Sequence, residues 1–373
     1  MSSNDVSEVL VEQVRQAIEN EMPLRIVGGD SKASLGNQVN DDNATLLNTR
    51  SHEGIISYDP TELVVTVRAG TLLSELNNAL SEAGQMLPFD PPDWPGSTIG
   101  GIIACGLSGP RRAFSGSARD YVLGTRVING QAQDLSFGGQ VMKNVAGYDV
   151  SRVQVGAWGT LGVLLDVSMK VLPKPERELT IRQHCKHRDL AAFAPLMRKP
   201  LPLSGAMLID DQRYLRLSGS DAAVRVAAAE LGGDIIEDDK LWQAVRDHTH
   251  PFFVTAREAA DSQDKTLWRI SVADYTPALG LPGEWLHEWA GGQRWLLTAA
   301  SAEEVFRVTG AAHGHATRYS VGERQTPAFQ PLNGAMQTLQ ARLRDSFDPL
   351  RIFNRGRFHP ELDVSSKLVA SGA

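Results

Sequence analysis

The chain has 373 residues, of which 42% are hydrophobic, and its formal net charge at pH 7 is −7. A chain of this length usually forms more than one hydrophobic core, so two domains are expected. Because its basic residues are scattered and outnumbered by acidic ones, nucleic acid is excluded as the main partner.

The N-terminal stretch MSSNDVSEVLVEQVRQAIENEM carries valine and leucine at helical spacing among acidic residues. It lacks the basic and apolar regions of a signal peptide. No stretch of the chain reaches the ~18 continuous apolar residues of a membrane-spanning helix. We therefore expect a cytoplasmic protein, with any membrane association going through a partner.

Glycine concentrates in three tracts of the N-terminal half. They are VGGDSKASLG (27–36), which follows an expected strand at 24–27, PGSTIGGIIACGLSGPRRAFSG (95–116), and VGAWGTLGV (155–163), which leads into an apolar strand. Glycine lets backbone N–H groups approach an anion, and a helix opening near Ile99 would add its positive end. A single tract is also compatible with a surface loop, but three favour a phosphate-bearing ligand. No tract matches GxGxxG followed by a helix, or GxxxxGK[ST], so a nucleotide site of another architecture is predicted.

The two cysteines are Cys105 and Cys185. An iron–sulfur cluster usually needs four thiolates, so this chain alone does not hold one, and electrons would be carried by an organic cofactor. A disulfide between them is not expected in a reducing cytoplasm. Cys105 is expected to be a small buried residue in the second glycine tract.

Residues 1–173 are predicted to be an α+β domain. Its expected strands are 54–58, 63–68, 121–128 and 162–172, and its expected helices are 71–83, capped by Thr71, and 148–153. Pro173 and Pro175 stop the last strand and mark a domain boundary.

Residues 174–330 are predicted to be an α/β sandwich of ferredoxin-like kind. Expected strands at 179–184, 205–209, 214–217 and 267–272 alternate with expected helices at 190–197, 221–231, 240–247 and 302–312. A last helix, 332–347, leads into FDPLRIFNRGRF, which is too apolar for a disordered tail. Residues 331–373 are therefore expected to return to the first domain.

The glycine tracts, with KNVAGYD (143–149) and GTLGVLLDVSMKVLPKP, resemble the FAD-binding fold of vanillyl-alcohol oxidase and its relatives, the PCMH type. Within that fold the chain is most similar to the family of FAD-binding E subunits of bacterial glycolate oxidases. The phrases LPFDPP, ACGLSGPRR, SGSARDYVLGTRVI, FGGQVMKNVAGYD, LPGEW and GGQRWL carry this similarity over nearly the whole chain.

The resemblance implies FAD bound between two α+β subdomains, the first ending near Asp59 and the second near Leu172, followed by a cap domain. The loop 28–33 and the tract 97–101 would bind the pyrophosphate through backbone N–H groups, residues 156–163 would follow the adenosine, and residues 104–109 would lie near the ring. The implied cofactor-binding residues are Val27, Gly28, Gly29, Asp30, Ser31, Lys32, Ala33, Pro91, Gly96, Ser97, Thr98, Ile99, Gly100, Gly101, Ala104, Cys105, Ser108, Gly109, Arg111, Arg112, Asn144, Gly147, Gly156, Gly159, Thr160, Gly162 and Val163.

Two details of this implied site depend on charge and attachment. Arg111 or Arg112 would balance the two negative charges of the pyrophosphate, although either is equally compatible with a surface charge. Relatives that bind FAD covalently use a histidine or cysteine, whereas this chain has Asp30 on the first loop. Non-covalent FAD is therefore expected.

The sequence does not identify the catalytic residues by a motif. Oxidising a 2-hydroxy acid needs a base for the hydroxyl proton and a cation for the carboxylate. Related catalytic subunits carry a metal-binding HxGDGNxH motif, but this chain has GAAHGHATRYS around His313 and His315. Two histidines at i, i+2 on a strand share a face, yet no third ligand is identified, so no metal is expected. His313, His315 and Arg318 are the candidate catalytic residues, and Arg318 also suits an ion pair.

The sequence thus predicts the FAD-binding subunit of a multisubunit complex that oxidises glycolate to glyoxylate. The partners would be a catalytic FAD subunit and an iron–sulfur subunit, and the flavin of this chain would relay electrons or complete the assembly. Two alternatives stay open: an independent FAD-dependent 2-hydroxy-acid oxidoreductase, and a structural subunit with a vestigial flavin site.

Overall fold

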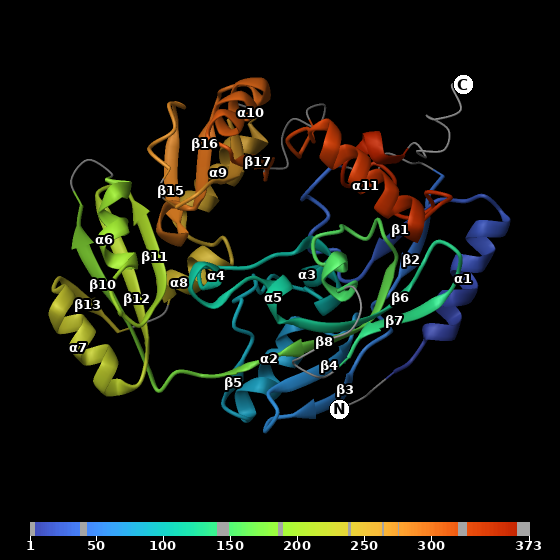
Figure 1. Cartoon of the computed structure of the whole chain (residues 1–373), viewed down its shortest axis with the longest axis horizontal. Helices are drawn as coiled ribbons and strands as arrows, with labels where there is room; N and C mark the ends of the chain where they lie inside the picture. The colour runs from blue at the N-terminus through green and yellow to red at the C-terminus, as the bar shows by residue number, and fades with distance from the viewer. Residues whose placement is uncertain are drawn as a thin grey trace.

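The computed structural model describes residues 4–37, 43–139, 149–185, 189–237, 240–262, 265–274, 276–319 and 327–363. Two sheets hold most of the strands. The five-stranded sheet lies at the lower right of Figure 1, and the eight-stranded sheet extends from the left to the top. No helix in these described ranges is both long and apolar enough to cross a lipid bilayer.

The five-stranded sheet is antiparallel throughout, in the order β3–β4–β8–β6–β7. Its strands are β3 (Ile55–Asp59), β4 (Val64–Arg68), β6 (Val122–Ile128), β7 (Asp134–Gly138) and β8 (Val163–Lys170). The central strand β8 is buried at all positions except Asp166 and Lys170, as expected for a strand covered on both faces. One face of the five-stranded sheet packs against helices α2 (Leu73–Glu82) and α3 (Ile99–Cys105), which supply Leu76, Leu80 and Ile103 to the core.

The other face of this sheet is covered by the N-terminal and C-terminal segments. Helix α1 (Ser7–Glu19) buries Leu10, Val14 and Ala17, which recur at helical spacing. They pack with Phe353 of the C-terminal segment. Strand β1 (Leu24–Val27) pairs in parallel with β2 (Thr45–Asn48), and a bridge joins Leu24 to Phe353. Helix α11 (Gly334–Phe347) therefore leads the chain back to the first sheet (Figure 1).

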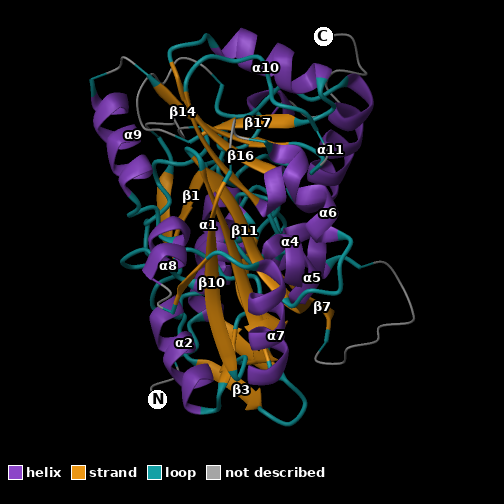
Figure 2. Cartoon of the chain, turned by 90° about the vertical axis from the view of Figure 1, so that its left-hand side faces the viewer, coloured by secondary structure: helices purple, strands orange, loops and turns teal. Residues whose placement is uncertain are grey.

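The eight-stranded sheet is antiparallel in the order β13–β10–β12–β11–β15–β16–β14–β17. Its strands are β10 (Arg177–His184), β11 (Leu203–Ile209), β12 (Gln212–Gly219), β13 (Asp234–Ile236), β14 (Thr266–Ser271), β15 (Glu284–Glu288), β16 (Gln293–Thr298) and β17 (His315–Arg318). Its helices are α6 (Ala194–Met197), α7 (Asp221–Leu231), α8 (Lys240–Arg246), α9 (Pro251–Asp261) and α10 (Ala302–Ala311). Figure 2 shows these helices arranged around the long strands β10 and β11.

Several elements differ from the sequence-based expectation. Helix α2 begins at Leu73, because the Thr71 hydroxyl accepts a hydrogen bond from the Gly54 amide at 2.9 Å instead of capping the helix. The helix expected at 148–153 is a 3-10 turn over Ser151–Gln154 among the described residues. Strands β13, β15, β16 and β17 are not among the four predicted strands of this sheet. Strands β15 and β16 lie in WLHEWAGGQRWLLT, which mixes charged and glycine residues with its apolar ones. The cap sheet is therefore twice as wide as the four predicted strands.

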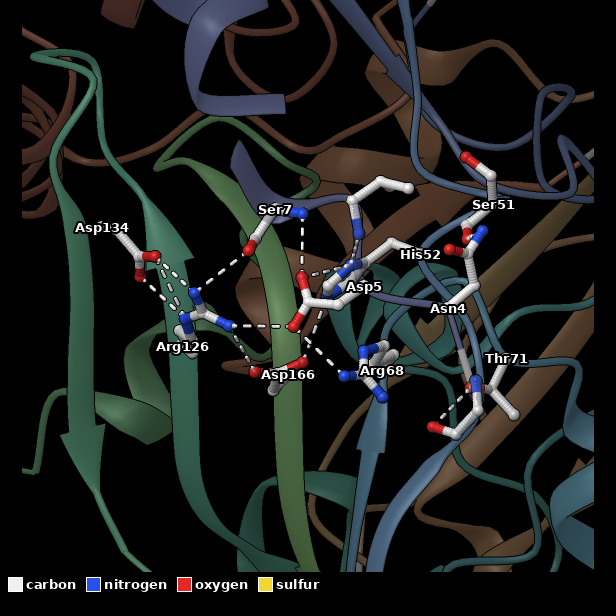
Figure 3. Close-up of polar contacts among 12 residues, drawn as sticks. Asn4, Asp5, Ser7, Ser51, His52, Arg68, Thr71, Arg126, Asp134 and Asp166 are labelled. Atoms are coloured by element: carbon white, nitrogen blue, oxygen red, sulfur yellow. Dashed lines mark hydrogen bonds and ion pairs between the residues drawn. The ribbon is translucent and has the colours of Figure 1, made fainter. Parts of the chain in front are cut away.

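The N-terminal segment is held to the first sheet by a polar network (Figure 3). His52 is fully buried, and its Nδ1 accepts a hydrogen bond from the Val6 amide at 3.2 Å. Its Nε2 then carries the proton and donates to Asp166 at 3.2 Å. Asp5 accepts from Arg68 at 3.1 Å. These contacts attach the segment before α1 to strands β4 and β8.

Candidate functional site

A solvent-open cleft of about 770 Å³ lies where the first and third glycine tracts meet helix α3. Its lining residues come from the loop after β1, from α3, from the turn before β8 and from the C-terminal segment. They are Ile26, Val27, Gly28, Gly29, Asp30, Ser31, Lys32, Ala33, Thr49, Ala69, Thr98, Gly100, Gly101, Ala104, Cys105, Gln154, Trp158, Gly159, Gly162, Leu164, Asn354 and Arg357. The cleft thus gathers most of the predicted cofactor-binding residues.

The loop after β1 lies directly against the second glycine tract. A Cβ on Gly29 would stand 1.6 Å from the carbonyl oxygen of Gly96, and one on Gly28 would stand 2.4 Å from Thr98 Oγ1. Only glycine permits this approach. In the described part of the chain, the amides of Gly29 and Ser31 donate to no other protein group. These amides can bind oxygens of a phosphate-bearing ligand.

The amides at the start of α3 are already used within the chain. The Ile99 amide donates to the Thr71 carbonyl at 2.9 Å, and the Gly100 amide to the Ala69 carbonyl at 2.8 Å. The Gly101 amide donates to the Thr98 hydroxyl at 3.3 Å. These three amides thus have acceptors within the chain, and the amides without one lie on the loop after β1, so the pyrophosphate contact of the second tract stays a prediction.

Lys32 places a buried ammonium group in the cleft. Its Nζ donates to Ser31 Oγ at 2.9 Å and to Ser97 Oγ at 2.8 Å. The side chain lies beside the ring of Trp94, with Nζ 5.5 Å from the ring centroid. Burial lowers the pKa of Lys32 to about 8.

The C-terminal segment completes the cleft. Asn354 accepts a hydrogen bond from the Ile26 amide and donates to the Trp158 carbonyl, both at 2.8 Å. Arg357 donates to the carbonyl oxygens of Lys32 at 2.7 Å and Ala33 at 3.1 Å. Sequence reasoning did not single out these two residues. The available signal was the polar NRGR inside an apolar segment that was expected to return to this domain.

A second cavity of about 1570 Å³ lies between the first domain and the cap sheet. Its lining residues are Leu35, Gly36, Cys105, Gly106, Leu107, Arg112, Ser117, Arg119, Val155, Gly156, Trp158, Arg269, Ser271, Trp289, His315, Ala316, Thr317, Arg318, Tyr319, Phe329, Gln330, Leu332, Phe358 and His359. Cys105 and Trp158 line both this cavity and the glycine-lined cleft. A ligand in the cleft can therefore extend toward the cap sheet.

The second cavity is strongly cationic. Arginines 112, 119, 269 and 318 line it, and no aspartate or glutamate is among its described lining residues. The guanidinium groups of Arg112 and Arg269 lie 4.4 Å and 5.5 Å from the centroid of the Trp289 ring. Arg269 also donates to Gln293 at 2.8 Å, which fixes its orientation. Like charges held this close favour an anionic ligand.

The two candidate histidines are separated by the fold. His315 is the first residue of β17 and lines the cationic cavity. His313 lies in the turn before β17 with φ of +55° and does not line the cavity. The expected pair on one strand face is therefore wrong. Among the described residues, no cluster of three or more His, Cys, Asp or Glu side chains suits a metal ion. Partial burial, and then the charges of Arg269 and Arg112, lower the pKa of His315.

Arg111 does not face the glycine-lined cleft. Its guanidinium forms an ion pair with Glu178 of β10 and a hydrogen bond with Ser218 of β12 at 3.3 Å. It lines a third cavity, together with Pro91 and with residues of the cap domain. Arg111 therefore joins the first domain to the cap strands, and neither Arg111 nor Pro91 lines the glycine-lined cleft.

Other predicted residues have structural partners. The Ser108 hydroxyl accepts from the Ala118 amide at 3.0 Å, and the Gly109 carbonyl accepts from the Trp289 indole at 3.1 Å. Thr160 donates to the Ala157 carbonyl at 2.7 Å, and Val163 is buried in β8. Asn144 and Gly147 lie outside the described residues. Cys105 and Cys185 are both free thiols, and burial raises the pKa of Cys105.

Comparisons with known proteins agree with this geometry. Residues 5–152 match the family described as FAD binding domain. The chain is 45% identical to glycolate oxidase subunit GlcE of Escherichia coli (strain K12), over 96% of this chain and 99% of that protein. It is 32% identical to glycolate oxidase subunit GlcD of Bacillus subtilis (strain 168), over 50% of this chain and 42% of that protein.

A solved structure of alkyldihydroxyacetonephosphate synthase is similar in fold. Its TM-score is 0.66 at 14% identity, with coverage of 93% of this chain and 75% of that one. The predicted FAD-binding fold and the predicted FAD cofactor are thereby confirmed.

Proposed function

The chain belongs to the family of glycolate oxidase subunit GlcE, and we propose that it is the FAD-binding subunit of a complex that oxidises glycolate to glyoxylate. The observation that carries this proposal is that two neighbouring cavities share two lining residues, Cys105 and Trp158. The glycine-lined cleft suits the diphosphate of FAD, and it meets a cationic cavity through Cys105 and Trp158. A carboxylate substrate and the flavin ring can therefore meet at the domain boundary.

The residues of the cleft fit FAD without a covalent bond. The loop after β1 offers free amides, Lys32 offers a cation, and the C-terminal Asn354 and Arg357 hold the walls in place. When bound, FAD accepts a hydride equivalent from the carbon that carries the substrate hydroxyl. The Asp30 carboxylate forms an ion pair with Arg25, with 2.9 Å between Oδ2 and Nη2. We therefore propose dissociable FAD.

Within the complex, we assign this chain to electron relay or assembly. The metal-binding motif that the resemblance assigns to the catalytic sister is absent from its sequence. Its partners would be a catalytic flavoprotein similar to GlcD and an iron–sulfur subunit, since this chain has only two cysteines. We place the complex in the cytoplasm, with any attachment to a membrane made by the partner subunits.

The cationic cavity favours a second candidate, in which the chain itself oxidises a small 2-hydroxy acid. Arg112 and Arg269 would bind and orient the carboxylate. The lowered pKa of His315 keeps its imidazole neutral near pH 7, so a ring nitrogen can accept the proton of the substrate hydroxyl. Trp289 would exclude water beside the two guanidinium groups.

Anaerobic titration of the purified chain with glycolate separates these candidates. In the relay role, the flavin absorbance bleaches only when the catalytic partner is present. Bleaching of the isolated chain by glycolate would overturn the relay role and support the second candidate. A chain that purifies and reconstitutes with little FAD would instead support a vestigial site.

A further inference from the structure

Lys32 is a buried cation with no anionic partner among the described residues. The whole residue is 6% exposed, and the two hydrogen bonds of its Nζ go to the neutral hydroxyl groups of Ser31 and Ser97. No ion pair between Lys32 and a carboxylate occurs in the described ranges, although most other buried cations here have one. Burying an uncompensated ammonium is costly, so an external anion is expected at this place.

The surroundings of Lys32 fit a diphosphate. The side chain lines the cleft between the loop after β1 and the second glycine tract. Next to it, the amides of Gly29 and Ser31 have no protein acceptor among the described residues. The nearby Asp30 carboxylate is occupied by Arg25. A cation, free amides and two hydroxyl groups thus surround one small volume.

We propose that Lys32 is the residue that recognises the diphosphate of FAD by charge, and that it makes FAD binding depend on pH. This inference rests on the FAD site of the proposed function. Ser31 and Ser97 hold the ammonium group between the two tracts, so that it is oriented before the cofactor arrives. The role that sequence reasoning gave to Arg111 or Arg112 belongs to Lys32.

The cap domain controls the shielding of this lysine. The Trp94 indole donates to the Asp247 carbonyl at 3.1 Å, directly after α8. The Asp93 amide donates to the Asp247 carboxylate at 2.8 Å. These two bonds hold Trp94 beside Lys32. The backbone carbonyl and the carboxylate of Asp247 therefore position Trp94, and the Trp94 ring keeps water away from the ammonium group.

The charges around Lys32 set the direction of the pH effect. Burial lowers its pKa to about 8, while Cys105 on α3 and Asp93 raise it by smaller amounts. Arg357 faces the loop through the Lys32 carbonyl. A bound diphosphate raises the pKa of Lys32, so the complex keeps a proton that the free protein loses above pH 8. By linkage, FAD affinity falls as pH rises above 8, by at most about tenfold per pH unit.

The test is a titration of FAD-free protein with FAD at several pH values from 6.5 to 9.5, with flavin fluorescence as the measure of binding. The variants are Lys32→Met and a matched control, Lys199→Met, which replaces an exposed lysine paired with Glu230 on the cap. Riboflavin, which carries the flavin ring without phosphate, is the second probe. Far-UV circular dichroism and thermal unfolding show that each variant is folded.

For the wild type and Lys199→Met, we expect FAD affinity to fall roughly tenfold or more between pH 7 and pH 9.5. Lys32→Met binds FAD roughly tenfold to a hundredfold more weakly at pH 7, and its profile is flat. Riboflavin binding is the same in all three proteins. The inference is overturned if Lys32→Met keeps the wild-type FAD affinity or the wild-type dependence of that affinity on pH. It is also overturned if Lys32→Met loses as much affinity for riboflavin as for FAD.

These outcomes separate this inference from the proposed function. If the wild type binds FAD tightly without dependence on Lys32, only the role of the lysine fails. If the wild type binds no FAD at any pH, the FAD site itself fails. Trp94→Ala adds a readout for shielding. We expect it to raise the pH at which FAD affinity begins to fall, because water then reaches the ammonium group, and an unchanged midpoint contradicts the role of Trp94.

Discussion

Arg112 of the second glycine tract lies over the indole of Trp289 in the cap domain, 4.4 Å from the ring centroid. The same indole donates its N–H to the carbonyl of Gly109 at 3.1 Å. Arg269 of β14 faces that ring from the cap sheet at 5.5 Å. One tryptophan therefore joins the two domains and brings together two cations from different domains.

The first prediction concerns this pair of arginines. Arg112→Met and Arg269→Met should each weaken the binding of glycolate to the FAD-loaded chain about tenfold or more, since a hydrogen bond to a charged group contributes about 1.5–3 kcal/mol. Isothermal titration calorimetry measures this. Arg198→Met, an exposed arginine of the cap domain, is the matched control and should bind normally. Equal binding by all three variants would show that the anion binds elsewhere.

The second prediction concerns the contact between the first two glycine tracts. A methyl group on Gly29 would stand 1.6 Å from the Gly96 carbonyl oxygen, so the two tracts must separate. We expect Gly29→Ala to lower the free energy of unfolding by about 2–3 kcal/mol and to leave the purified protein with little FAD. Thermal unfolding and the flavin absorbance measure the two effects.

Gly280→Ala is the control for this substitution. A Cβ at Gly280 meets no atom within 4 Å, and its φ lies outside the left-handed region. It should therefore keep both wild-type stability and wild-type FAD content. A Gly29→Ala protein with the same properties as this control would contradict the close packing of the two tracts.

Sequence reasoning predicted the fold class and the glycine-lined cleft because both depend on local patterns. Glycine tracts mark places where backbone must approach a ligand or another chain segment, and apolar periodicity marks the main strands and helices. The approach of Gly29 to Gly96 was not predictable, since it joins segments 67 residues apart in the chain. The width of a sheet also depends on long-range pairing, so four strands of the cap sheet, β13, β15, β16 and β17, were not predicted.

The charges were the hardest part to predict. Arg111 and Arg112 are neighbours in sequence, yet one pairs with Glu178 and the other lines the cationic cavity. Their separation is set by the packing of the cap domain on the tract. Lys32 was among the residues that the resemblance implies for cofactor binding, but its burial was not predicted, because it depends on Trp94, whose indole donates to the Asp247 carbonyl. Burial of this kind cannot be read from composition or spacing.

The third prediction concerns the ion pairs between the domains. Glu178 accepts hydrogen bonds from Arg111 and from Ser218, and it lies 3.9 Å from the buried Arg216. Glu178→Gln leaves both guanidinium groups with less compensating charge, so we expect the free energy of unfolding to fall by about 3 kcal/mol. Denaturant unfolding measures it. Glu230→Gln breaks the exposed pair with Lys199 and should cost about 0.5 kcal/mol or less. Equal losses of unfolding free energy in Glu178→Gln and Glu230→Gln would contradict a stabilising role for the ion pairs between the domains.

The fourth prediction concerns acid and the N-terminal segment. Hydrogen bonds from Ser7, and then a hydrogen bond from Arg68, hold the pKa of Asp5 well below its usual value of 3.8 (Figure 3). A carboxyl group whose pKa is lower in the folded state stabilises the fold above its unfolded pKa. That contribution is lost as pH falls below about 4 toward the folded pKa. Asp5→Asn should therefore lower stability at pH 7 and flatten its decline between pH 5 and pH 3.

Denaturant unfolding at pH 7, 5, 4 and 3 tests this, with Glu21→Gln as the control at an exposed position. Both the wild type and the control should lose stability more steeply than Asp5→Asn as pH falls. The side chain of Asp5 is 43% exposed, so solvent screens its ion pairs and salt should reduce the difference. If Asp5→Asn and the wild type decline in parallel, the acid sensitivity of the chain arises from other carboxyl groups, and the network in Figure 3 does not hold the segment by charge.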